Sequence, residues 1–101
     1  MATIQNIAPT TASATVTVGC ENYERVTFAA SVLATTETVA VNVLLPDGVT
    51  AVPAMDTAGA ITGLTATNGT RTYYGGADYQ LVKSTTAGNC GVYTIPVGKD
   101  D

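Results

Sequence analysis

The sequence has no histidine, no tryptophan and a single phenylalanine. Without histidine, the usual base for a serine or cysteine nucleophile is missing, and Lys83 or a carboxylate would have to replace it. The carboxylates are scattered over predicted turns and loops, so none forms an evident acid–base pair. Two cysteines without histidine cannot complete a structural zinc site. We therefore expect a protein that is not an enzyme, uses no cofactor and binds no metal.

Charge is also scarce, at 12% of residues, with eight carboxylates against four basic groups and a net charge of -4. The basic residues are too few and too dispersed to neutralise a phosphate track, which argues against nucleic acid as a partner. The same low charge, combined with 46% hydrophobic residues, argues against disorder, because disordered chains are kept open by charge and low hydrophobicity.

Long hydrophobic runs are missing too. No window approaches about 18 consecutive apolar residues, so no membrane span is expected. The first residues, 1–6, lack the basic start and apolar core of a secretory signal, and we expect synthesis in a cytoplasm. Cys20 and Cys90 then have two interpretations: small buried hydrophobic residues, as is usual in a cytoplasm, or a disulfide that would close most of the chain.

Valine, alanine and threonine dominate the chain, and they alternate with period two rather than with helical spacing. Val and Thr suit a pleated, half-buried surface. With turn signals about every ten residues, this pattern predicts an all-β fold, a small antiparallel β-sandwich or jelly roll of about eight short strands. The expected strands are 12–20, 24–33, 37–45, 49–53, 60–67, 70–74, 78–83 and 90–96.

The clearest strand is 37–45, which is followed by the turn sequence Pro46-Asp47-Gly48. Its alternation predicts one buried face, shared with residues of two other strands: Val39, Val41, Val43 and Leu45 with Val26, Phe28 and Leu81. We expect one sandwich domain over residues 12–97 and a solvated tail at 98–101. Residues 1–11 are either an N-terminal contact arm or an edge strand, and these two alternatives stay open.

The tyrosines are the main candidates for binding. Tyr73 and Tyr74 are adjacent on one strand, so one must face the core and the other solvent, and Tyr79 and Tyr93 are expected on neighbouring strands. The tyrosines either cap the core or anchor a protein–protein interface, where tyrosine is enriched. With the two isoleucines of the N-terminal segment, the predicted partner-binding residues are Ile4, Ile7, Tyr73, Tyr74 and Tyr79.

Residues 37–95 resemble small accessory virion proteins of tailed bacteriophages. The resemblance lies in the run 70–83, in the small-residue loop Thr86-Ala87-Gly88, in the closing strand that begins Gly91-Val92, and in the valine-rich strand before Pro46. It implies a capsid decoration (cement) protein, or a related head or tail-fibre module, located in the virion. Its partner would be the major capsid protein or another virion protein, and it would be a homo-oligomer.

A second possibility is a β-sandwich binding module of fibre-tip or adhesin type that recognises a host surface or a carbohydrate. The two functions call for different surfaces. A cement protein needs a flat contact face of mixed apolar and threonine residues, whereas an adhesin needs a concave site lined by tyrosine and by aspartate or asparagine.

Overall fold

The computed structural model describes residues 3–98, which contain nine strands and no helix, so the all-β prediction is confirmed. No segment of these residues is therefore a helix long and apolar enough to cross a membrane. The strands are β1 (Ile4–Thr10), β2 (Ala14–Gly19), β3 (Arg25–Ala30), β4 (Thr38–Leu44), β5 (Ala51–Pro53), β6 (Leu64–Thr65), β7 (Thr70–Tyr74), β8 (Asp78–Lys83) and β9 (Cys90–Val97).

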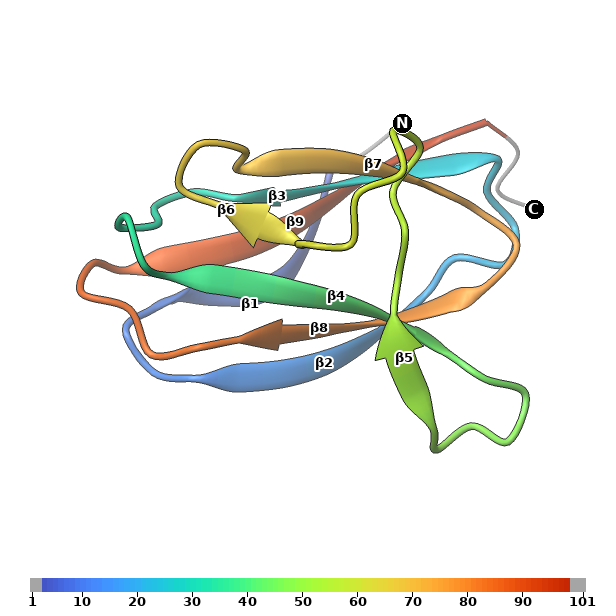
Figure 1. Cartoon of the computed structure of the whole chain (residues 1–101), viewed down its shortest axis with the longest axis horizontal. Helices are drawn as coiled ribbons and strands as arrows, with labels where there is room; N and C mark the ends of the chain where they lie inside the picture. The colour runs from blue at the N-terminus through green and yellow to red at the C-terminus, as the bar shows by residue number, and fades with distance from the viewer. Residues whose placement is uncertain (1–2, 99–101) are drawn as a thin grey trace.

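The strands form two sheets that pack as a β-sandwich (Figure 1). Sheet A has the order β1-β9-β3-β7, and sheet B has the order β2-β8-β4-β5, with β6 pairing beside β5 on the same strand β4. Every paired strand is antiparallel to its neighbour. The predicted antiparallel sandwich is therefore confirmed.

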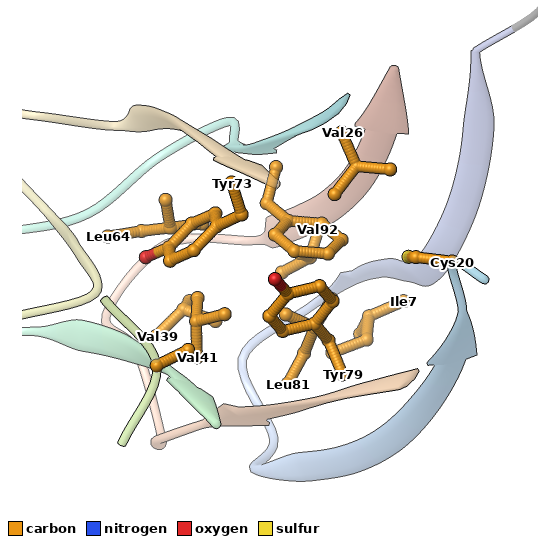
Figure 2. Close-up of a cluster of buried hydrophobic side chains, with 12 residues drawn as sticks. Ile7, Cys20, Val26, Val39, Val41, Leu64, Tyr73, Tyr79, Leu81 and Val92 are labelled. Atoms are coloured by element: carbon orange, nitrogen blue, oxygen red, sulfur yellow. The ribbon is translucent and has the colours of Figure 1, made fainter. Parts of the chain in front are cut away.

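The core lies between the sheets, where alternate residues of each strand point inward. Figure 2 shows side chains of the two sheets meeting there. Six of the seven predicted core residues are buried or packed against the core: Val26, Phe28, Val39, Val41, Val43 and Leu81. The exception is Leu45, which is 39% exposed because β4 ends at Leu44 and Leu45 already begins the turn.

Three aromatic rings join the two sheets at the centre of the core. Phe28 and Tyr73 come from sheet A and Tyr79 comes from sheet B, and their ring centroids lie 5.6 to 5.7 Å apart in all three pairs. The rings are tilted or edge-on, which is the arrangement that aromatic quadrupoles favour. Tyr79 also donates a hydrogen bond from its hydroxyl to the carbonyl of Tyr74 at 2.6 Å.

The turn after β4 forms as the sequence indicates. The Asp47 carboxylate accepts hydrogen bonds from the backbone N–H groups of Val49 and Thr50, at 2.9 and 2.8 Å, and from the Thr50 hydroxyl. Gly48 has φ of +74°, a conformation that residues with a side chain rarely adopt. These contacts close the hairpin between β4 and β5.

The N-terminal segment is an edge strand and not an arm. Residues Ile4–Thr10 are β1, which pairs with β9, and the Ile7 side chain is 6% exposed. Ile7 is buried because β1 completes sheet A opposite the edge of sheet B that β2 forms. Residues 1–2, and residues 99–101 of the predicted tail, lie outside the described part of the chain.

The strand expected at 60–67 is reduced to the two residues of β6, and Ile61 is 58% exposed in a loop. The loop is fixed by contacts that are distant in sequence. Arg71 donates from Nε to the Gly63 carbonyl at 2.5 Å. A Cβ on Gly63, whose φ is +72°, would lie 2.5 Å from the Val39 carbonyl oxygen, so only glycine allows this close approach.

Candidate interaction surface

The strand register brings together a continuous surface on the outer face of sheet A. Directly opposed residues of an antiparallel pair share a face. Three rows therefore cross β9, β3 and β7 on the solvent side, one above the other. We call this nine-residue surface the outer A face: Tyr93, Ala29 and Thr70; Ile95, Thr27 and Thr72; Val97, Arg25 and Tyr74.

Two contacts hold side chains of the outer A face in place. The ring of Tyr93 lies along β9 over Gly91, close enough that a Cβ on Gly91 would be 2.6 Å from the Tyr93 hydroxyl oxygen. The hydroxyls of Thr27 and Thr72 are hydrogen-bonded to one another at 2.9 Å across β3 and β7. The tyrosine ring thus covers the sheet without projecting from it, and the threonines satisfy part of their own hydrogen bonding.

The outer A face is nearly uncharged and mixes threonines with apolar side chains. Its aliphatic and aromatic side chains are accessible, with Ile95 37%, Val97 47% and Tyr74 58% exposed. Of its nine residues only Arg25 is charged. Covering such a face requires little removal of water from charged groups, which is the costly part of burying a polar surface.

The structure brings only part of the predicted binding set to the surface. Tyr74 is 58% exposed on the outer A face, and Ile4 is 40% exposed on β1. The prediction is wrong for Ile7, Tyr73 and Tyr79, which are at most 6% exposed. Tyr73 and Tyr74 are adjacent on β7 and face opposite sides of sheet A, with Tyr73 in the aromatic cluster. Tyr79 points into the same cluster from β8.

Sequence reasoning missed most of the surface. Tyr79 and Tyr93, expected on neighbouring strands, belong to different sheets, with Tyr93 on the outer A face. The usable signal was the alternation of β9, where inward Val92, Thr94 and Pro96 leave Tyr93, Ile95 and Val97 outward. The sequence of β9 does not indicate that β1 and β3 lie beside it, because the order of strands depends on the whole fold.

Asp56 and Arg71 form an ion pair of 2.8 Å at the end of the core. The Asp56 carboxylate also accepts hydrogen bonds from the N–H groups of Ala58 and Ala60, both at 2.9 Å. The Ala60 N–H, and then the Arg71 guanidinium, hold the pKa of Asp56 below its ordinary value. Beside this pair, burial raises the pKa of Tyr73 to about 12. Asp56 and Arg71 thus fasten the loop after β5.

Lys83, the candidate replacement for a histidine base, is 1% exposed. Its ammonium donates to the carbonyl of Ala12 at 2.6 Å and to that of Ser84 at 3.4 Å. Lys83 therefore ties the β1–β2 connection to β8 and has no access to a substrate.

The two cysteines are free thiols, so the possible disulfide is not present. Both side chains are fully buried. Burial, followed by the negative charge of Asp78, raises the pKa of Cys20 to about 12, which keeps the thiol protonated and unreactive. The cysteines serve as small core residues.

Two open pockets lie near the β2–β3 connection. One, of about 160 Å³, is lined by Gly19, Glu21, Asn22 and Tyr23. The other, of about 420 Å³, places Glu21 and Asp78 across from Leu44, Leu45 and Pro46. Both are shallow depressions at one end of the sandwich, and they share Glu21.

Within residues 3–98, no three histidine, cysteine, aspartate or glutamate side chains are grouped as a metal site would require. No protein-family model matches the chain, and neither a curated protein nor a solved structure matches it.

Proposed function

We propose that the chain is a structural virion protein, a capsid decoration (cement) protein that binds the lattice of the major capsid protein through the outer A face. The observation that carries the proposal is the character of that face. It is built from threonine, tyrosine and aliphatic residues, the Tyr93 ring lies against Gly91 of its own strand, and Arg25 is its single charge. The resemblance of residues 37–95 to phage accessory proteins supports the same assignment.

The titratable groups support a role in binding rather than in chemistry. Asp56, Arg71 and Lys83 are used inside the fold. Asp47 and Glu37 accept backbone hydrogen bonds in loops. These five charged side chains therefore stabilise the fold, and we expect other molecules to bind to the exposed sheet surface.

A repeating partner suits a domain of this size. A standard protein interface takes about 800 Å² from each partner, about one seventh of this chain's 5332 Å² surface. A single contact of that kind gives modest affinity. On a shell, neighbouring copies raise one another's effective concentration and convert modest contacts into stable attachment.

The test is co-sedimentation of the purified protein with heads of the phage that encodes it. Val97→Glu places a charge in the outer A face, and Val32→Glu is its matched control, because Val32 is 50% exposed in the loop after β3 and Val97 is 47% exposed. We expect saturable binding at fixed stoichiometry for the wild type and for Val32→Glu. Val97→Glu should bind roughly tenfold more weakly or worse.

Equal melting temperatures of the two variants would establish that the loss is not a folding defect. Failure of the wild-type protein to sediment with heads would refute the proposed function. Equal binding by Val97→Glu and Val32→Glu would refute the assignment of the outer A face.

One observation favours the second candidate, a module that recognises a carbohydrate or host surface. The pocket of about 160 Å³ is lined by Tyr23, Asn22 and Glu21, residue types that can stack on a sugar and form hydrogen bonds with it. Binding of the protein to a glycan array, abolished by Asn22→Ala, would support this candidate. Absence of glycan binding with retained head binding would exclude it.

A further inference from the structure

Strand β2 forms an open edge of sheet B. It pairs with β8 in unbroken register from Ala14 opposite Lys83 to Gly19 opposite Asp78, and the sheet order leaves it terminal. Figure 1 shows β2 at the lower margin of the molecule, with no strand of the described chain beyond it. Alternate residues of an antiparallel strand direct their N–H and C=O groups away from the partner strand. These groups of β2 are therefore available to another strand.

The other edges within residues 3–98 are protected in ways that β2 is not. Strand β1 contains Pro9 and two shifts in register against β9. The edge of β7 is covered by the loop after β5, where the Thr57 N–H donates to the Thr72 carbonyl at 2.9 Å. Strand β5 has three residues and ends in Pro53, and β6 has two. Irregularity, proline, covering loops and shortness are the devices by which proteins block edge pairing.

The sequence of β2 favours pairing. It contains Thr15, Val16, Thr17 and Val18, with no charge and no proline, and both residue types have high strand propensity. Val16 and Val18 face the core but are only partly buried, whereas Thr15 and Thr17 are exposed. An added strand would cover the valines and pair with the threonines.

We infer that β2 pairs with β2 of a second copy of this chain, antiparallel across a twofold axis, so that sheet B continues through both molecules. Opposed residues must share a face of the sheet. The axis therefore passes through a residue, and the greatest overlap of the two copies of β2, Ala14–Gly19, places it at Val16 or Thr17. Either choice sets threonine against threonine across the junction. The Thr27–Thr72 pair, at 2.9 Å, has this same contact inside one molecule.

A second copy fits the edge better than an unrelated strand would. A twofold interface requires a surface that complements itself, and the residues directly beside each axis match: Thr15 and Thr17 flank Val16, and Val16 and Val18 flank Thr17. The molecule has a net charge of -4, but Thr10–Gly19 contributes no charge, so the paired strands meet without like-charge repulsion. Because a strand pair is smaller than a standard interface, we expect a dissociation constant on the order of 10–100 µM.

The experiment is sedimentation equilibrium on the purified chain across that concentration range, with no phage particle present. The double variant Thr15→Lys/Thr17→Lys sets lysine against lysine in both possible registers and should raise the dissociation constant by roughly tenfold or more. The control Thr35→Lys/Thr36→Lys adds the same charge at exposed positions of the loop before β4 and should dimerise like the wild type.

A second readout does not depend on variants. Amide hydrogen exchange of β2 in the wild-type protein should slow as the protein concentration rises, while exchange in β7 should not change. A monomeric wild type up to millimolar concentration, or unchanged dimerisation of Thr15→Lys/Thr17→Lys, would overturn the inference. Since no particle is used, neither result depends on whether the outer A face binds a capsid.

Discussion

Replacing Phe28 by alanine tests the account of the core most severely. Phe28 is fully buried, and its ring lies 5.6 Å from that of Tyr73 and 5.7 Å from that of Tyr79. The variant leaves a cavity where the two sheets meet and removes two aromatic pairs. Phe→Ala substitutions in cores cost about 3–5 kcal/mol, against a total stability of ~5–15 kcal/mol for a domain of this size.

Since 1 kcal/mol shifts the melting temperature of a small domain by about 4–8 °C, Phe28→Ala should melt at least ~12 °C below the wild type. Phe28→Leu, which fills most of the cavity, should cost only about 1–2 kcal/mol. The control is Val49→Ala in the turn after β4, where Val49 is 81% exposed and the cost should stay within ~0.5 kcal/mol. Thermal denaturation followed by circular dichroism measures all three. A shift below ~4 °C for Phe28→Ala would refute the aromatic cluster as the link between the sheets.

The remaining predictions concern charge and reactivity. Val41→Asp buries an unpaired carboxylate and should leave no folded domain by circular dichroism; a retained melting temperature would refute the register of β4. The folded-state pKa of Asp56 lies below its ordinary value of 3.8, so its contribution is full above that value and is lost as pH falls through the folded-state pKa. The stability difference between wild type and Asp56→Asn, measured by urea denaturation, should therefore be largest above about pH 4 and shrink in acid; a pH-independent difference contradicts this. Cys20 and Cys90 should react with a thiol reagent only on unfolding; rapid labelling of the native protein would show that they are accessible.

Local patterns were sufficient to predict much of this fold. Alternation of Val39, Val41 and Val43 with polar or small residues located β4 to within a residue at each end, because a half-buried strand needs little beyond its own period. The turn Pro46-Asp47-Gly48 was predictable because its geometry depends on proline, on a short carboxylate and on a glycine within a few positions.

Contacts between distant residues account for most of the errors. The loop around Asp56 depends on the ion pair with Arg71, 15 positions away. The residues near Ile61 do not indicate this ion pair, so a strand at 60–67 was predicted where β6 has two residues. Lys83 can be buried because the carbonyl of Ala12, 71 positions away, accepts a hydrogen bond from its ammonium group. Each contact exists only after the sheets have assembled.

For the candidate surface, too, some features could be predicted from local sequence and others depend on distant contacts. Because Tyr73 and Tyr74 are adjacent, the sequence predicted that they face opposite sides of the strand. It did not predict which of the two is buried. Ile7 was predicted to contact a partner, but it pairs with Val92 of β9 and is buried, a pairing that the N-terminal sequence does not indicate. Order of strands within a sheet, which decides what lies beside Ile95, is the least local property of the molecule.

Hydroxyl-radical footprinting of the protein on purified phage heads tests the central claim, that the outer A face is the contact surface. Tyr74 and Tyr93 lie on that face, and Met55, 61% exposed in the loop after β5, lies off it; all three side chains react readily with the radical. Oxidation of Tyr74 and Tyr93 should fall on binding, while that of Met55 should not change. Protection of Met55 with unchanged oxidation of the two tyrosines would contradict the claim.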